Sequence, residues 1–121
     1  MHVTSKVCMG KDVGLNGNLF GGNMLAWIDE SAYIFADGIT NGRYFLVTKK
    51  FGEIVFEKPV KEGDIVHFNC GNVSVGNTSI SFNISAVVNR DTVFSTSVVF
   101  VAIDENGKKT EINKDMVNTV E

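Results

Sequence analysis

Apolar residues recur along this chain at two different spacings. Between positions 22 and 37 they follow the helical spacing, at Leu25, Ile28, Ala32 and Phe35. Gly38 follows this segment and is expected to end the helix. Because further apolar residues occupy its other faces, the helix is expected to be buried on nearly all sides.

The remaining periodic segments alternate with a period of two, which is typical of strands with one buried face. The clearest is 78–90, where Ile80 and Phe82 alternate with Ser81 and Asn83. The expected strands cover residues 3–9, 44–56, 64–75, 78–90 and 92–103, with a β-bulge near Gly71. Residues 76–77 and 89–91 are short enough to close hairpins.

One helix about 24 Å long and strands about 40 Å long predict an α+β domain, in which a curved antiparallel sheet of five to six strands wraps a central helix. The pattern also fits an α+β roll of another topology. No linker or repeat interrupts the sequence, so residues 1–121 are interpreted as a single domain.

Composition narrows the class of function. The chain has 121 residues, 44% of them hydrophobic, one proline and a formal net charge of −3. This balance disfavours a disordered chain and a nucleic-acid partner. No apolar run reaches the length of a membrane span and no signal peptide is evident, so a cytoplasmic location is expected. Cys8 and Cys70 lack metal or redox spacing and are expected to be buried.

Asp29 is the first candidate for chemistry, because it places a carboxylate within an otherwise apolar helix. Its neighbour Glu30 points about 100° away around the helix axis. An aspartate in this position either lies on a solvated stripe, forms a hydrogen bond in a dimer, or acts as an acid–base group or nucleophile.

Gly21 and Gly22 stand where this helix begins. The first N–H groups of a helix lack intrahelical acceptors and lie at the positive end of its dipole, so they can bind an anion or a developing oxyanion. The alternative is a tight turn that lets the helix pack against the sheet. The carboxylate two turns later favours a site.

Residues 16–30, which read NGNLFGGNMLAWIDE, resemble the signature of hot-dog-fold acyl-CoA thioesterases, and most closely that of small bacterial broad-range acyl-CoA hydrolases. Further similar segments are 42–48, 56–64, 75–80 and 100–107. The resemblance implies a hot-dog fold and hydrolysis of acyl-CoA to free acid and CoA. It implies that Asp29 is the general base or nucleophile, and that Thr48 helps to place water from the partner subunit.

One position departs from the family's pattern. Many members carry an asparagine three residues before the glycine of the Asn-Gly-Asn turn, and here that position is Gly14. Asn16 or Asn18 could supply the missing amide.

The resemblance also suggests where coenzyme A binds. The groove residues would be the turn Gly76, Asn77, Thr78 and Ser79, with Arg43, Lys58 and Lys61 as phosphate partners. Taken singly, these residues equally fit a hairpin turn and solvated lysines. No metal or cofactor is expected, since coenzyme A is part of the substrate, and the family's assembly implies a homodimer and a trimer of dimers.

Other functions remain open on sequence alone. A non-catalytic hot-dog module that binds acyl-CoA or supports assembly is the main alternative, motivated by Gly14. A dehydratase would need a positioned histidine, and His2 and His67 lie far from the helix in sequence. Ser31 lacks the GxSxG elbow of a triad hydrolase. His67 is expected to be a surface or cross-strand residue.

Overall fold

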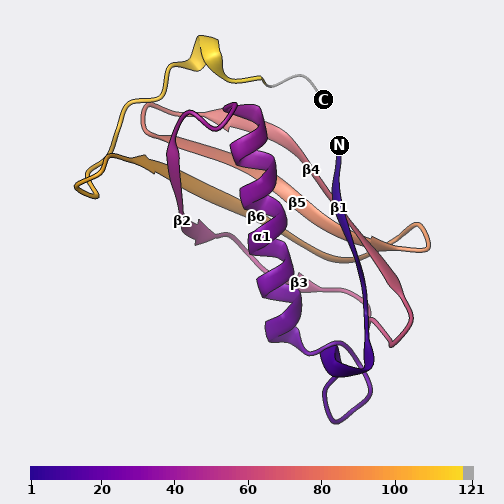
Figure 1. The fold of residues 1–121 in the computed structure, drawn as a ribbon. Helices are drawn as coiled ribbons and strands as arrows, with labels where there is room; N and C mark the ends of the chain where they lie inside the picture. Colours follow the sequence, from indigo (N-terminus) through magenta and orange to yellow (C-terminus); the bar gives the residue numbers. More distant parts are fainter. Residues whose placement is uncertain (119–121) are drawn as a thin grey trace.

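The computed structural model describes residues 1–118. In chain order the elements are β1 (His2–Val7), the short 3-10 helix η1 (Gly10–Asp12), α1 (Gly21–Ile39), β2 (Phe45–Phe51), β3 (Val55–Phe56), β4 (Ile65–Val75), β5 (Ser79–Val88), β6 (Asp91–Ile103) and the 3-10 helix η2 (Lys114–Met116). Figure 1 shows α1 lying across one face of the sheet.

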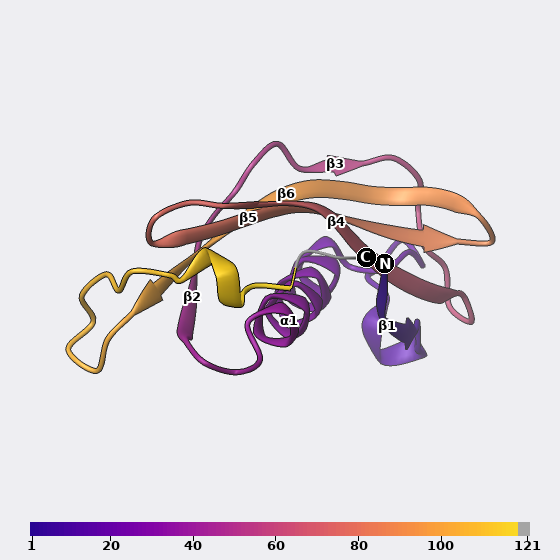
Figure 2. The same cartoon turned by 90° about the horizontal axis from the view of Figure 1, so that it is seen from above.

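The strands form one antiparallel sheet in the order β1-β4-β5-β6-β2, and β3 pairs with β6 beside β2. Seen from above, this sheet arches over α1, with β1 on one side of the helix and β2 on the other (Figure 2). One helix covered by a curved antiparallel sheet confirms the expected architecture. β1 and β2 are the sheet's two edges, so each lies beside a different flank of α1.

The core lies between α1 and the inner face of the sheet. Alternation along β5 turns Ile80, Phe82 and Ile84 inward, where they are almost fully buried. Phe82 meets Phe35 of α1 edge-on, with ring centroids 4.8 Å apart. The opposite face of the same strand carries serine and asparagine. Hydrophobic burial on one sheet face therefore fixes how α1 sits.

The helix is longer than predicted, because Gly38 lies inside it and does not end it. The helix ends at Ile39, and Thr40 donates its hydroxyl hydrogen to the Ala36 carbonyl at 2.9 Å. Asn41 and Gly42 then adopt positive φ angles of 54° and 67°. The turn at these two residues stops the helix, since continued right-handed geometry is impossible there.

The expectation that α1 is buried on nearly all sides is wrong for one flank. Tyr33 and Ile34 are 43% and 48% exposed, and Ala26 is also exposed. The buried positions are Met24, Ile28, Ser31, Ala32, Phe35, Ala36 and Ile39. The exposed apolar side chains leave part of the helix uncovered by its own sheet.

The segment predicted as a single strand, 44–56, forms two strands instead. β2 ends at Phe51, its pairing with β6 shifts register between Thr48 and Lys50, and β3 begins only at Val55. Gly52 donates its N–H to the Ser97 carbonyl at 2.8 Å, and a side chain at Gly52 would collide with the Ser97 hydroxyl. This close approach bends the chain out of the sheet for three residues.

The bulge expected near Gly71 is confirmed. The register of β4 against β5 shifts between Gly71 and Ser74, and Asn72 takes a positive φ of 57°. The extra residue keeps apolar side chains facing the helix on both sides of the bulge. No helix among residues 1–118 is long and apolar enough to cross a membrane.

Candidate active site

Asp12 holds the start of α1 in place, a role that the sequence analysis missed. Its carbonyl accepts hydrogen bonds from the Phe20 N–H at 3.0 Å and the Asn23 side-chain amide at 2.9 Å. Its carboxylate accepts from the Met9 N–H at 2.9 Å and the Lys11 ammonium at 3.1 Å. The Met9 N–H and the Lys11 side chain hold the pKa of the Asp12 carboxyl below its ordinary value.

The two glycines at the helix start leave their N–H groups directed out of the helix. The Phe20 carbonyl accepts the N–H groups of Asn23 and Met24, the first bonds of the helix ladder. The N–H groups of Gly21 and Gly22 precede that ladder and have no acceptor within the helix. A Cβ atom at Gly22 would lie 3.0 Å from the Phe20 ring, so this aromatic ring already closely covers the first turn.

Asp29 receives a hydrogen bond from Thr48, a residue of β2. The Thr48 hydroxyl donates to Asp29 Oδ1 at 2.7 Å, across the flank of α1 that faces β2. The Asp29 side chain is partly buried and Thr48 is exposed. The resemblance implied that Thr48 acts from a partner subunit, but here it contacts the aspartate of its own chain. The bond leaves the second carboxylate oxygen open to another group.

Glu30, the next residue, faces the opposite flank. Its carboxylate lies 3.0 Å from the Lys6 ammonium on β1, and both side chains are substantially exposed. Its charge is thus paired with a lysine, whereas Asp29 has a neutral hydroxyl as its partner.

Asn16 and Asn18 lie in the loop before α1, and both use their amide oxygens for structure. Asn16 Oδ1 accepts the N–H of Asn18 at 3.0 Å, and Asn18 Oδ1 accepts from the Lys61 ammonium at 3.2 Å. Gly14 closes the same loop by donating its N–H to the Asn18 carbonyl at 2.8 Å. A Cβ atom at Gly14 would meet only ordinary contacts, 3.6 Å or more away.

The residues predicted to bind coenzyme A lie at two opposite ends of the chain's fold. In the turn 76–79, the Asn77 carbonyl accepts the Ile112 N–H, and the Asn118 N–H in turn reaches Ile39 at the C-terminal end of α1 (Figure 1). Arg43 contacts Met116 of the same C-terminal segment at 3.5 Å. Lys58 lies beside the N-terminal end and pairs with Asp91 at 3.3 Å. A single chain does not bring these predicted residues together.

The remaining candidate nucleophiles and bases lie outside this site. His67 Nδ1 lies 2.6 Å from the Ser5 hydroxyl, which also lies 2.8 Å from His2 Nε2. This exposed cross-strand cluster on β1 and β4 confirms the expectation for His67. Cys8 and Cys70 are both buried, as predicted, and form no disulfide with each other. Burial raises the pKa of the Cys8 thiol, which disfavours its thiolate.

No three histidine, cysteine, aspartate or glutamate side chains within residues 1–118 come together as a metal site would require.

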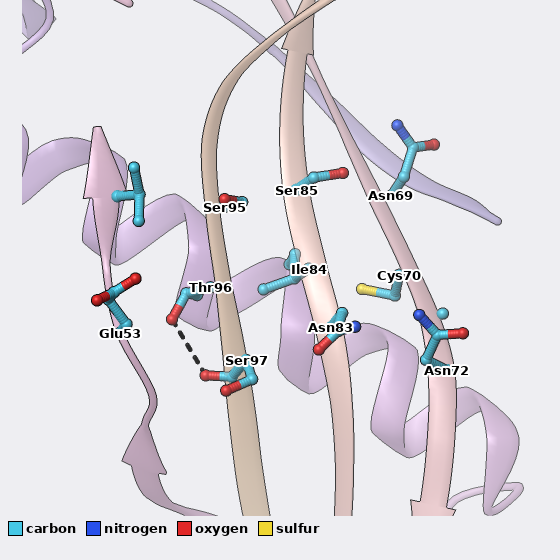
Figure 3. Close-up of a pocket in the computed structure, with 12 residues that line it drawn as sticks. Glu53, Asn69, Cys70, Asn72, Asn83, Ile84, Ser85, Ser95, Thr96 and Ser97 are labelled. Atoms are coloured by element: carbon cyan, nitrogen blue, oxygen red, sulfur yellow. Dashed lines mark hydrogen bonds between the residues drawn. The ribbon is translucent and has the colours of Figure 1, made fainter. Parts of the chain in front are cut away.

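Two hollows of similar size lie on opposite faces of the sheet. The outer-face hollow, about 480 Å³, is lined largely by polar residues of β4, β5 and β6, among them Asn83, Ser85 and Ser97. Figure 3 shows these side chains in front of the strands and α1 behind them, so this hollow is separated from Asp29 by the sheet. The other, about 420 Å³, lies at the helix start beside Gly21 and has a mostly apolar wall.

The sequence of this chain is similar to those of known thioesterases. Residues 16–95 match the model of the thioesterase superfamily. An acyl-CoA thioester hydrolase of Buchnera aphidicola, itself uncharacterized, is 32% identical, over 91% of this chain and 87% of the relative. The acyl-CoA thioester hydrolase YciA of Escherichia coli K12 is also 32% identical, over 88% of this chain and 86% of its own length.

Solved structures agree with the sequence relatives. A hexameric hotdog-fold thioesterase of Campylobacter jejuni superposes with a TM-score of 0.85 at 31% identity, over 95% of this chain and 92% of that one. An aspartate-to-alanine variant of the Staphylococcus aureus acyl-CoA hydrolase gives a TM-score of 0.79 at 26% identity, over 89% of this chain and 69% of that one. The family model spans more than half of the chain and the fold agrees with it, so this protein belongs to the thioesterase superfamily and has the hot-dog fold.

Proposed function

We propose that this protein hydrolyses acyl-CoA thioesters to a free acid and coenzyme A, with Asp29 as its catalytic carboxylate. The observation that carries the proposal is the partly buried Asp29, oriented by Thr48 on a helix that begins with two free glycine N–H groups. Relatives named acyl-CoA thioester hydrolases over most of their length support the reaction. The aspartate substituted in the Staphylococcus aureus hydrolase supports the residue type.

The chemistry follows from these groups. Asp29 either takes a proton from a water that attacks the thioester carbon, or attacks that carbon itself to form an anhydride that water then cleaves. The carbonyl oxygen gains negative charge as the new C–O bond forms, and the N–H groups of Gly21 and Gly22 would stabilise it. When the C–S bond breaks, the coenzyme A thiolate leaves and takes up a proton. The step uses no metal.

The spacing on α1 supports a site shared between two chains. Gly22 and Asp29 are seven residues apart, about 10 Å along the helix axis. The N–H groups at a helix start point away from the rest of the helix, so an oxyanion bound there lies still farther from Asp29 of the same chain. A carboxylate from a second copy would close this gap. The exposed flank of α1 that carries Ala26 and Tyr33 is suited to bury that copy.

This arrangement also supports the expected assembly. β2 is an edge strand whose Phe45 and Val47 are exposed, and unpaired edge strands with apolar residues readily pair with a second copy. We propose a homodimer through β2 and α1, and a trimer of dimers, since similar solved thioesterases are hexameric. In such a dimer, the turn 76–79 of one chain could flank a coenzyme A whose thioester lies at the helix start of the other. Two buried cysteines that form no disulfide with each other support a reducing cytoplasm as its location.

Gly14 marks where this protein departs from a relative. In the Staphylococcus aureus hydrolase, the aspartate and the asparagine that were changed to alanine are fifteen positions apart, the separation of Gly14 and Asp29 here. We propose that Asn16 or Asn18 supplies the amide that Gly14 lacks. Gly14→Asn, whose Cβ would meet only ordinary contacts, is then expected to leave kcat within about twofold, and a several-fold gain would show that neither asparagine replaces the missing amide.

The first experiment measures release of free thiol from a panel of acyl-CoAs by the purified oligomer. Turnover on at least one chain length is expected. Binding of acyl-CoA without any turnover would overturn hydrolysis and favour a non-catalytic acyl-CoA-binding module, the alternative that Gly14 motivates.

The second experiment tests the shared site by mixing two inactive variants. Asp29→Asn removes the carboxylate, and Gly22→Pro removes the Gly22 N–H, one of the two proposed oxyanion donors, in the first helical turn where proline is tolerated. If each site takes Asp29 and Gly22 from different chains, a mixed dimer keeps one intact site, and random mixing restores about a quarter of wild-type activity. No recovery after verified subunit exchange would place both groups on one chain.

A third experiment separates the two roles of Asp29. In a single turnover in ¹⁸O-labelled water, ¹⁸O enters the Asp29 carboxylate only if Asp29 acts as the nucleophile.

A further inference from the structure

The hollow at the start of α1 is bounded by several parts of the fold. Gly21 and Met24 contribute the first helical turn, Phe56 comes from β3, and Val93 from β6. Pro59 and Val60 close the side between β3 and β4. We name this space of about 420 Å³ the helix-start hollow. It shares Gly21 with the proposed oxyanion site, so a group bound in it lies directly beside the reacting carbonyl.

The buried part of the helix-start hollow is lined by apolar side chains. Met24, Val60 and Val93 are each only 3% exposed and form its floor, while Phe56 stands exposed at the rim. Leu19 and Pro59 complete the apolar wall. A chain of methylenes would exchange water for hydrocarbon along this wall, whereas the amides of a pantetheine arm would lose hydrogen bonds there.

The cation and two amide oxygens that line the hollow are already engaged elsewhere, and the carboxylate of Glu57, which also lines it, would repel a phosphate. Lys58, the one cation among its described lining residues, pairs with Asp91 at 3.3 Å. The amide oxygen of Asn18 accepts from Lys61, and that of Asn16 accepts a backbone N–H. A phosphate or pantetheine bound here would have to compete with these bonds, and an acyl chain would not.

We infer that the helix-start hollow binds the acyl chain of the substrate, and that Met24 and Val93 at its floor set the longest chain that fits. This inference rests on the proposed thioesterase function and adds the direction in which the substrate lies. The coenzyme A arm then leaves on the other side of the carbonyl, away from Lys58. Each methylene buried along the wall is expected to raise kcat/KM about fourfold, until the chain end reaches the floor.

The test compares kcat/KM across straight-chain acyl-CoAs of four to sixteen carbons. Met24→Ala deepens the hollow and is expected to move the optimum to chains longer by two or more carbons. Val93→Met fills the floor and is expected to move it in the opposite direction. Met9→Ala, which removes an exposed methionine outside the hollow, is the matched control and should keep the wild-type profile.

Inhibition by free coenzyme A separates the two arms of the substrate. Because the acyl chain occupies the hollow in this inference, the inhibition constant of free coenzyme A should stay within about twofold in Met24→Ala and Val93→Met. A changed constant with an unchanged chain-length profile would overturn the inference and place the coenzyme A arm in the hollow. An unchanged profile in both folded variants would overturn it as well.

A rim variant keeps the test decisive if a floor variant fails to fold. Phe56 is exposed, so Phe56→Ala should fold, and it is expected to raise KM for long chains while leaving KM for the shortest chain unchanged. An equal change for every chain length would contradict the inference. Failure of the wild-type protein to hydrolyse any acyl-CoA would instead contradict the proposed function, so the two failures are distinguishable.

Discussion

The two flanks of α1 carry neighbouring carboxylates in different surroundings. On the flank facing β1, Glu30 pairs with Lys6 at 3.0 Å in a solvent-exposed ion pair. On the flank facing β2, Asp29 is partly buried and accepts a hydrogen bond from the Thr48 hydroxyl. A lysine neutralises one carboxylate, and a hydroxyl orients the other without cancelling its charge. The comparison shows that two carboxylates on one helix differ in their availability for chemistry because their hydrogen-bond or ion-pair partners differ.

The sharpest test of this comparison changes each carboxylate to its amide. Asp29→Asn is expected to lower kcat about 10³-fold, because the amide can neither accept the proton of water nor attack the thioester. Glu30→Gln is the matched control one residue away and should keep kcat within about twofold. Thiol release under saturating acyl-CoA measures both. Equal losses in the two variants would remove the distinction between the flanks.

The second-largest effect is expected from Thr48, the hydrogen-bond donor to Asp29. Thr48→Val keeps the shape of the side chain but removes the hydrogen bond to Asp29, so kcat is expected to fall about tenfold, equivalent to roughly 1.4 kcal/mol. Thr48→Ser retains the hydroxyl and should recover most of the rate. If the valine variant is as active as wild type, Asp29 does not depend on this bond for its orientation.

The third prediction concerns Asp12, whose carboxylate stabilises the loop before α1 and should lose this effect in acid. The Met9 N–H and Lys11 lower the pKa of Asp12 in the folded protein below its ordinary value of 3.8. A lowered pKa means that Asp12 contributes stability above pH 3.8 and that this contribution disappears as the pH falls from there through the lower folded pKa. Thermal melting of wild type and Asp12→Asn across pH 7 to 2 measures it. The difference in Tm should shrink on acidification, and a constant difference would speak against this role.

The smallest effect is expected from the ion pair on the β1 flank. Lys6 and Glu30 are exposed, so solvent screens them, and a double-mutant cycle with Lys6→Met and Glu30→Gln should give a coupling energy of about 0.2 to 1 kcal/mol. Urea unfolding at low and high salt measures the coupling, which should fall in salt. A coupling above 2 kcal/mol would mean that this flank is more constrained than its exposure indicates.

Local patterns predicted most of the secondary structure. The strands expected at 64–75, 78–90 and 92–103 differ from those observed by at most two residues at either end. Alternation and helical spacing come from backbone geometry within a few residues, so the sequence reports them directly. The break between β2 and β3 was missed, because it depends on Gly52 meeting Ser97, a residue far away in sequence.

The candidate site was predicted unevenly for the same reason. Asp29, Gly21 and Gly22 could be selected because they lie on one helix, whose spacing fixes their geometry. Asp12 was missed, since its hydrogen bonds to Phe20 and Asn23 depend on how the loop folds back. The predicted coenzyme A residues were assigned singly, and the structure places them at two ends of α1.

By itself the sequence determined that one glycine-led helix with a carboxylate two turns along packs against long antiparallel strands. Only the tertiary structure decided that Thr48 orients that carboxylate, that Lys6 pairs with its neighbour, and that an apolar hollow adjoins the helix start. The physical reason is the distance along the chain over which each kind of interaction acts. Periodicity and helix geometry act between neighbours in the chain, whereas a partner or a pocket depends on which distant strands close around the helix.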